Sequence, residues 1–327
     1  MAGLIGIDLS TLPTLVNVLV FVATVIAVAK GAGWFVEGAS GLGRRLGLSD
    51  LVLGLTVVAI GTSAPEFAVS VGAALRGHGD IAVSNVVGSN IFNQGIILGV
   101  LAMIRPLSTG PLVTFRDGGV LLAGTIFAFL TIGLDLRLSR FDGIALVSGL
   151  LAYLLWLIHV GRRDQRLVPL GPVPAAAASV ASDGWHFVLG LSTILVAASF
   201  MVDAATSVAR DFGVSEWVIG VTIVAAGTSA PELATSLAAA ARGKQDLSVG
   251  ALVGSDIFNL FGVVGVSGLI HPVTVAPEAR ISLLSFVLMV ALVMLLMRLD
   301  WRISRRDGVI LVLVALGRWV IDILSAG

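Results

Sequence analysis

The chain has 327 residues and a formal net charge of zero at pH 7; 57% of its residues are hydrophobic and 12% are charged. Its mean hydropathy of +1.04 is far above that of a soluble globular domain and predicts an integral membrane protein. The absence of cysteine excludes a disulfide framework and a thiolate metal site, and four singly placed histidines give little support to a zinc-type enzyme. The sequence has no basic stripe with interleaved aromatic residues, so a nucleic-acid partner is not expected.

Apolar runs separated by Arg, Pro and Gly clusters predict ten membrane-spanning helices, because each run is long enough to cross a bilayer. In chain order we place them at 13–36, 50–75, 80–104, 118–135, 141–160, 185–208, 215–241, 246–270, 281–298 and 307–324. The segment 161–184 is first polar and then rich in Pro and Ala, and we interpret it as a linker between two halves. Residues 1–14 lack the basic start of a signal peptide, so we expect the first span to be retained.

The basic residues predict the orientation, because cytoplasmic loops are enriched in Lys and Arg. With the N-terminus outside, thirteen basic residues fall in inner loops and five in outer loops. The inner set is Arg44, Arg45, Arg105, Arg116, Arg162, Arg163, Arg166, Arg242, Lys244, Arg298, Arg302, Arg305 and Arg306, and the outer set is Arg76, Arg137, Arg140, Arg210 and Arg280. We therefore predict a multi-pass protein of the cell (inner) membrane with both termini extracytoplasmic.

An internal repeat runs through the chain. The segments 54–66 (GLTVVAIGTSAPE) and 220–232 (GVTIVAAGTSAPE) are identical at ten of thirteen positions, with an offset of 166 residues. The same offset relates GSNIFN at 88–93 to GSDIFN at 254–259. The repeat thus divides the chain into two homologous halves.

Each half carries five predicted spans, so the second half enters the membrane from the opposite side. The predicted fold is an all-α integral membrane protein of ten transmembrane helices, arranged as two inverted-topology five-helix repeats with broken helices at the midplane. The halves are residues 1–160 and 185–327, with their most similar parts at about 50–104 and 215–270. This architecture is typical of secondary transporters, whose binding sites lie near the bilayer midplane.

Each GTSAPE hexapeptide places a glutamate inside an apolar span. A carboxylate at membrane depth is costly, so Glu66 and Glu232 are functional candidates by default. The prolines before them, Pro65 and Pro231, lack a backbone donor, and we predict that each helix breaks there.

A helix break frees backbone carbonyls, for which Ala59 and Ala225 are the candidates, and glycines at Gly61 and Gly227 allow a bend and a close approach. Hydroxyl and amide side chains surround the two glutamates in the sequence. These are Thr62, Ser63, Thr228, Ser229, Ser89, Ser255, Asn93 and Asn259. An inventory made only of oxygen ligands is typical of sites for Ca²⁺ and Na⁺. One Ca²⁺ neutralises two facing glutamates, and competition with Na⁺ for the same pocket would couple the two ions.

These motifs resemble the cation/calcium exchanger superfamily, in its prokaryotic sodium/calcium exchanger branch. The signature of that family is a GTSxPE/D-type helix break followed by a GSxxxN/D-type segment, once in each of two inverted repeats. The resemblance implies antiport of Na⁺ against Ca²⁺ by alternating access, without a cofactor and without catalysis of a reaction. It implies the two ions as substrates and the lipid bilayer as surroundings, and no obligate protein partner is evident.

Carried over to this sequence, the family's ion-binding centre falls on Glu66, Glu232, Asn93 and Asn259. The hydroxyl residues above and the carbonyls of Ala59 and Ala225 supplement it. Some members have aspartate at the position of Asn259, so the amide here leaves the relative Na⁺ affinity and the stoichiometry open. Asp256 lies one turn before Asn259, but the family pattern does not make that position a primary ligand, and we leave it out of the predicted site.

Other interpretations stay open at this point. A proton-coupled calcium exchanger is the first alternative, although that branch typically has a GNxxE-type motif in place of Thr-Ser. A non-transporting membrane protein is the second. The prolines can be simple kinks, the hydroxyls can bond their own helices, and the asparagines can join helices to one another. Glu37 and Asp203, matched near the ends of two helices, are interpreted as solvated or paired with Arg.

For the transport cycle, we predict that the first helix of each half, around 13–36 and 185–208, moves against a core formed by the broken and polar helices. A glycine-rich surface of the first helix, with Gly31, Gly33 and Gly38, is compatible with such sliding.

Overall fold

A computed structural model describes residues 12–167, 179–212 and 225–325 of the chain. Within these ranges, seven helices are long and apolar enough to cross a membrane, or eight if the bent pair Asp50–Thr62 and Ala64–Leu75 forms one span. The chain is therefore a helical, multi-pass membrane protein.

The described part of the first half contains ten α-helices and strands in the order that follows. They are α1 (Thr14–Arg45), α2 (Asp50–Leu53), α3 (Ala59–Thr62), α4 (Ala64–Leu75), α5 (Gly79–Phe92), α6 (Leu98–Ile104), β1 (Leu107–Ser108), α7 (Gly118–Ala128), β2 (Arg137–Leu138) and α8 (Arg140–Leu167). The described part of the second half contains α9 (Val180–Asp211), α11 (Ala225–Thr228), α12 (Ala230–Ala241), α13 (Gln245–Ile257), α14 (Gly265–Ile270), β3 (Val273–Thr274), α15 (Glu278–Asp300), β4 (Arg302–Ile303) and α16 (Arg305–Ser325).

Several of these helices are joined by π-helical segments, in which each backbone hydrogen bond spans five residues instead of four. In the described residues they cover Gly54–Val58, Asn93–Ile97, Leu112–Asp117, Phe129–Gly133 and Phe258–Val264. Such segments are rare and occur often at functional sites. Two of them contain the predicted amide ligands, because one begins at Asn93 and the other holds Asn259 as its second residue.

Within the described residues, the observed helices cover the predicted spans and often extend beyond them. α1 and α9 have 32 residues each, which corresponds to about 48 Å of helix, whereas the hydrocarbon core is only about 30 Å thick. Apolar patterning marks the part of a helix in the hydrocarbon, so it does not show where the helix ends in water. α8 and α9 accordingly reach into the segment 161–184, of which residues 168–178 lie outside the described ranges.

Two other predicted spans need comment. Residues 215–224 of the predicted span 215–241 lie outside the described residues, and the remainder forms α11 and α12. The predicted span 307–324 is helical as part of α16, although α16 is not among the seven helices that satisfy the criteria of length and apolarity.

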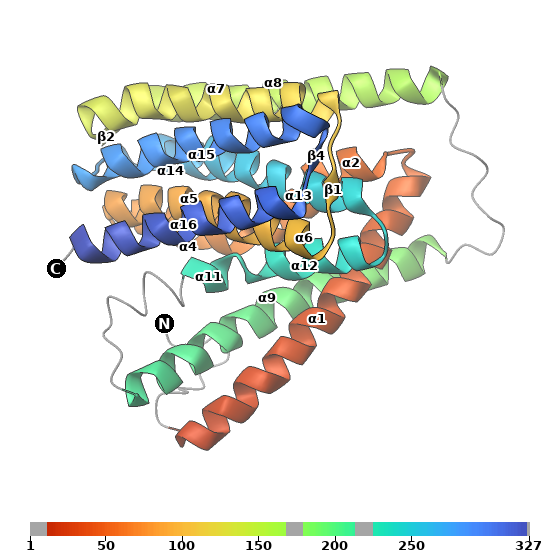
Figure 1. Ribbon diagram of the computed structural model, residues 1–327, viewed down its shortest axis with the longest axis horizontal. Coiled ribbons are helices and arrows are strands. Elements are labelled where there is room, and N and C mark those ends of the chain that lie inside the picture. The colour runs from red at the N-terminus through yellow and green to blue at the C-terminus, as the bar shows by residue number, and fades with distance from the viewer. Residues whose placement is uncertain (1–11, 168–178, 213–224, 326–327) are drawn as a thin grey trace.

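α1 and α9 form a pair that is tilted away from the stack of the other helices (Figure 1). Their backbones come together at glycines: a Cβ at Gly38 would lie 2.6 Å from the carbonyl oxygen of Asp183, and one at Gly190 would lie 2.7 Å from the Cα of Phe35. The expected glycine-rich surface of α1 is divided, because Gly31 and Gly38 face α9 whereas Gly33 faces the guanidinium of Arg242.

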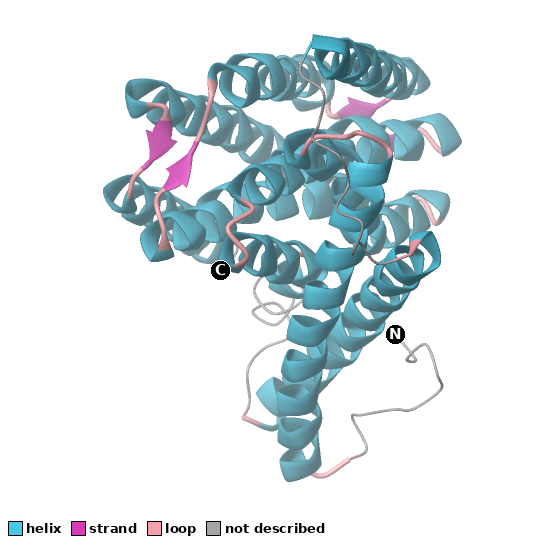
Figure 2. Ribbon diagram, turned by 90° about the vertical axis from the view of Figure 1, so that its right-hand side faces the viewer, coloured by secondary structure: helices cyan, strands magenta, loops and turns pink. Residues whose placement is uncertain are grey.

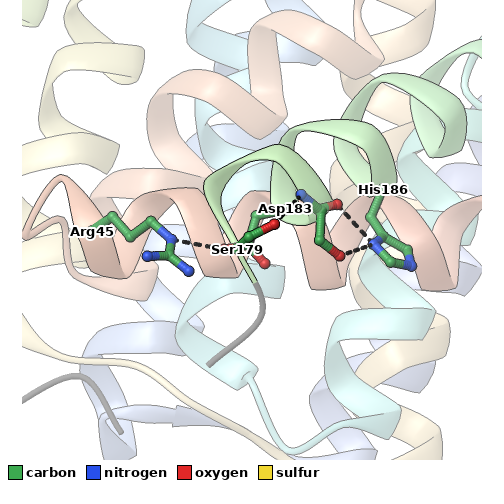
Figure 3. A network of polar contacts seen from close by, with 5 residues as sticks. Arg45, Ser179, Asp183 and His186 are labelled. Atoms are coloured by element: carbon green, nitrogen blue, oxygen red, sulfur yellow. Dashed lines mark hydrogen bonds and ion pairs between the residues drawn. The ribbon is translucent and has the colours of Figure 1, made fainter. Parts of the chain in front are cut away.

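The start of α9 is fixed by polar contacts with α1 (Figure 3). Ser179 caps the helix by accepting from the backbone N–H of Ser182 at 3.1 Å. Arg45, near the end of α1, donates to Asp183 at 2.8 Å. Gly41 leaves room for this contact, since a Cβ there would lie 2.7 Å from Oδ2 of Asp183. The pair of long helices is thus held by charge at this end as well as by close packing.

An ion pair between described residues joins this helix pair to the rest of the molecule. Glu37 of α1 accepts from Arg242, in the turn between α12 and α13, at 3.2 Å, and the Glu37 side chain is 55% exposed. Glu37 is therefore paired with arginine, as interpreted from the sequence.

The buried apolar side chains form two main clusters. The larger one lies between α5, α6, α7, α8, α13, α14, α15 and α16, and the smaller one joins α1 and α9 to α12 and α13. The strands, drawn in magenta in Figure 2, form two short antiparallel pairs, β1 with β4 and β2 with β3. They lie at opposite ends of α15, because β3 directly precedes this helix and β4 directly follows it. Each strand pair combines one strand from each half of the chain, so the two halves are connected at both ends of this helix.

Candidate ion-binding site

The bend in each GTSAPE segment lies two residues before the proline. α3 ends at Thr62, Ser63 has φ −79° and ψ 10°, and α4 starts at Ala64 after a bend of 51°. Ser229 has a similar conformation, with φ −88° and ψ 7°, between α11 and α12. The prediction of breaks at Pro65 and Pro231 is corrected to these serines. The reason is that proline is tolerated in the first turn of a helix, where its missing N–H has no partner to lose.

This geometry places both glutamates in the first turn of a new helix. Glu66 lies in the first turn of α4 and Glu232 in the first turn of α12. The N-terminal end of a helix carries a partial positive charge, which favours a carboxylate. Glu66 is 0% exposed and Glu232 is 1% exposed, so neither side chain contacts bulk water.

Hydroxyl groups cross between the two halves to bind these carboxylates. Ser63 donates to Oε1 of Glu232 at 3.1 Å, and Ser229 donates to Oε1 of Glu66 at 3.3 Å. Ser255 also donates to Oε1 of Glu232 at 3.0 Å, and its hydroxyl lies 2.7 Å from that of Ser63. The serine at each helix break therefore serves the glutamate of the other half.

The two predicted amide ligands have their nitrogens engaged and their oxygens unused. Nδ2 of Asn93 donates to Oδ1 of Asp256 at 3.0 Å, and Nδ2 of Asn259 donates to Oδ1 of Asn90 at 3.1 Å. Both asparagines are fully buried. Their side-chain oxygens have no hydrogen-bond partner among the described residues.

The two glutamates resemble the two asparagines in having one buried oxygen that accepts no hydrogen bond from the described residues. One buried oxygen of each is without a partner in the described residues: Oε2 of Glu66, Oε2 of Glu232, Oδ1 of Asn93 and Oδ1 of Asn259. An unsatisfied buried acceptor costs about 1–3 kcal/mol, and more when it is charged. A cation bound to these oxygens would offset that cost, and a hard cation such as Ca²⁺ or Na⁺ suits carboxylate and amide oxygens. The residues present thus fit an oxygen-coordinated cation as the bound substrate.

Soft metals are not favoured by the same residues. Within the described ranges, no group of three or more His, Cys, Asp or Glu side chains is placed to hold a metal ion. A cation here would therefore be held by two carboxylates and by neutral oxygens.

Two other predicted ligands make contacts within their own helices. Thr62 donates to the carbonyl oxygens of Val58 and Ala59 at 3.1 and 3.3 Å, and Ser89 donates to the carbonyl of Asn85 at 2.8 Å. Thr62 and Ser89 are both buried, and the hydroxyl of Thr62 also lies within hydrogen-bonding reach of the Glu232 carboxylate.

The expectation of a freed carbonyl at Ala59 is also corrected. That carbonyl accepts from the backbone N–H of Ser63 at 3.1 Å, because the helix continues to Thr62. Pro65 lacks the N–H that would donate to the carbonyl of Gly61, so the proline leaves the Gly61 carbonyl without a helical donor.

Ala225 is the first described residue of its segment, and the role of its carbonyl stays a prediction. Thr228 ends α11 and is half-buried.

The two glycines of the hexapeptides differ in their surroundings. A Cβ at Gly227 would overlap Cγ2 of Val202 in α9, whereas a Cβ at Gly61 would meet Phe35 and Leu191 at an ordinary 3.5 Å. Close approach is thus required at Gly227 and not at Gly61. Sequence identity between the repeats could not show this difference, because it depends on which side chain packs opposite each glycine.

Three polar residues of the site were not in the predicted set. Asn90, Gln94 and Asp256 are buried and bind one another or the two asparagines, with Gln94 donating to Asp256 at 2.9 Å. A signal for Asp256 was present in the sequence, because a carboxylate inside an apolar span is a functional candidate by itself.

The chain is similar in sequence and fold to known membrane proteins. The family model described as sodium/calcium exchanger protein matches residues 16–159 and 183–321. The sodium/calcium exchanger MaX1 of Methanosarcina acetivorans is 30% identical over an alignment of 335 positions, which covers 91% of this chain and 96% of MaX1. Inner membrane protein YrbG of Escherichia coli is 37% identical over 289 residues, which cover 86% of this chain and 88% of YrbG.

Solved structures of a sodium-calcium exchanger are similar as well. The structure of NCX_Mj soaked with 10 mM Na⁺ and 10 mM Sr²⁺ matches with a TM-score of 0.81 and 31% sequence identity, over 95% of this chain and 99% of that chain. The similarity therefore extends over nearly all of both chains. On the family match, the identities and the shared fold, the chain belongs to the sodium/calcium exchanger protein family.

Proposed function

We propose that the protein exchanges Na⁺ for Ca²⁺ across the cell membrane at the site formed by Glu66, Glu232, Asn93 and Asn259. The observation that carries the proposal is the set of four buried oxygens without partners, one from each of these residues. Two carboxylates match the charge of one Ca²⁺ or of two Na⁺. Competition for the same oxygens then couples the release of one ion to the binding of the other.

We further propose ten transmembrane helices in two inverted repeats, with both termini extracytoplasmic. The offset of 166 residues between the repeated motifs and the reciprocal contacts Ser63–Glu232 and Ser229–Glu66 support this arrangement. Alternating access then consists of movement of α1 and α9, as a pair, against the remaining helices. The ion pair Glu37–Arg242 crosses that boundary and must change when the pair moves.

The test is ⁴⁵Ca²⁺ uptake into proteoliposomes loaded with Na⁺, choline or acid. Uptake that requires the outward Na⁺ gradient is the expected result. Uptake driven only by the proton gradient would assign the protein to the proton-coupled alternative, and no uptake under any of these conditions would contradict both assignments.

Asn259→Asp is expected to favour Ca²⁺ over Na⁺. The added carboxylate attracts a divalent ion about twice as strongly as a monovalent ion at the same distance. Its neighbour Asn90 is a neutral amide, so the new carboxylate does not face a second negative charge there. The measurement is the Na⁺ concentration that halves ⁴⁵Ca²⁺ binding, which we expect to rise several-fold.

Asn93→Asp is the matched comparison, because Asn93 is the counterpart of Asn259 in the first repeat. Here the new carboxylate would face the carboxylate of Asp256, which has no proton to donate. We therefore expect Asn93→Asp to weaken Ca²⁺ binding. Equal competition curves for the wild type and Asn259→Asp would place Asn259 outside the site.

A further inference from the structure

Asp256 is a third buried carboxylate beside the two glutamates. It is 0% exposed, and its counterpart in the first repeat is Asn90, so the two halves differ in charge at this position. Both of its oxygens are engaged: Oδ1 accepts from Asn93 at 3.0 Å and Oδ2 accepts from Gln94 at 2.9 Å. Asp256 therefore contacts a proposed ion ligand without being in the set of residues with an unpartnered oxygen.

The contact with Asn93 has a consequence for coordination. The two ends of an amide group are nearly equal in shape, but one end donates hydrogen bonds and the other accepts them. A carboxylate only accepts, so it selects the orientation in which the NH₂ group of Asn93 faces Asp256. The oxygen of Asn93 is then directed away from Asp256, and it is buried without a hydrogen-bond partner in the described residues.

The same aspartate acts on the second amide ligand through its backbone. The carbonyl of Asp256 accepts from Nδ2 of Asn90 at 3.0 Å, which leaves Oδ1 of Asn90 as the acceptor for Asn259 at 3.1 Å. Asn259 consequently donates with its nitrogen and keeps its own oxygen unpartnered. One residue thus determines the orientation of Asn93 directly and of Asn259 through Asn90.

We propose that Asp256 is a positioning residue, whose carboxylate holds Asn93 with its oxygen toward the bound cation. The inference rests on the proposed function and adds to it the reason why two amides can serve as ligands in a chain that lacks aspartate at position 259. An amide that turned its NH₂ group toward a cation would repel it. Fixing the amide before the ion arrives also removes the need to order it during binding.

The test is Ca²⁺ binding to the purified full-length chain in detergent and Na⁺-free choline buffer, measured by isothermal titration calorimetry. Asp256→Asn preserves the shape of the side chain but places an NH₂ group against Asn93 or Gln94, one of which must turn. Loss of an orienting partner of a metal ligand typically weakens binding 10–100-fold, and we expect the Kd for Ca²⁺ to rise by about that factor. An unchanged Kd would overturn the inference while leaving the proposed function intact. A wild type that binds no Ca²⁺ would overturn both.

Two double variants distinguish orientation from charge. Asp256→Asn combined with Asn259→Asp restores the number of carboxylates to three, but Asn93 has no carboxylate to orient it. We expect this double variant to bind Ca²⁺ about 10–100-fold more weakly than Asn259→Asp alone. Asp256→Asn combined with Asn93→Asp exchanges the two groups; a carboxylate at position 93 presents an oxygen in either orientation, so we expect the Kd to return close to that of the wild type.

Other outcomes would contradict the inference. Equal recovery in both double variants would mean that Asp256 acts only by its charge. No recovery in either, together with a lower unfolding temperature in the absence of ions, would mean that Asp256 serves only the packing of the helices.

Discussion

Replacing Glu66 or Glu232 by glutamine is expected to abolish Na⁺-dependent Ca²⁺ uptake. Each variant removes one of the two negative charges that would balance a bound divalent ion. Both glutamates are buried, so bulk water cannot replace the lost charge. Glutamine also brings an NH₂ group to a position where an oxygen is without a partner. Each variant is expected to fold, because removing one of two buried like charges relieves repulsion and desolvation.

The measurement is ⁴⁵Ca²⁺ uptake into Na⁺-loaded proteoliposomes that contain equal amounts of each variant. Glu278→Gln is the matched control: Glu278 also lies in the first turn of an apolar helix, but it is exposed. We expect the control to transport like the wild type. Transport retained by Glu66→Gln or Glu232→Gln would contradict the assignment of the site.

Gly190→Ala is expected to lower the stability of the fold strongly. A Cβ at this position would overlap the backbone nitrogen of Phe35 and lie 2.7 Å from its Cα, so α9 would have to move away from α1. A backbone cannot turn aside as a flexible side chain can. Overpacking of a well-packed contact costs about 1–3 kcal/mol, and here the misfit is between two main chains. The measurement is the unfolding temperature of the detergent-solubilised protein, which we expect to fall by several degrees.

The control lies in the same helix. A Cβ at Gly184 would meet no heavy atom within 4 Å, so Gly184→Ala is expected to leave the unfolding temperature unchanged or slightly raised. The same lowering in both variants would show that α9 is sensitive to any substitution. No lowering in Gly190→Ala would show that α1 and α9 do not approach each other as closely as described.

The sequence alone was sufficient for the membrane class and for the two glutamates. Long apolar runs have one physical solution in a bilayer, which is a helix, and a carboxylate in such a run is too costly to keep without a purpose. The duplication then made each motif evidence for the other. Glu66 and Glu232, Asn93 and Asn259 were predicted in this way, and all four are buried with one oxygen unpartnered in the described residues.

The tertiary structure decided which side chains form hydrogen bonds with each predicted ligand residue. The bond from Ser63 to Glu232 joins residues 169 positions apart, and local preferences carry no information about such a pair. The overlap at Gly227, with room at Gly61, likewise depends on the neighbouring helix rather than on the motif. Asp256 is the clearest case. The sequence shows only a carboxylate inside the GSDIFN motif of an apolar span. The packed helices show that its two oxygens accept from the amides of Asn93 and Gln94, because only packing sets the direction of a hydrogen bond between distant segments.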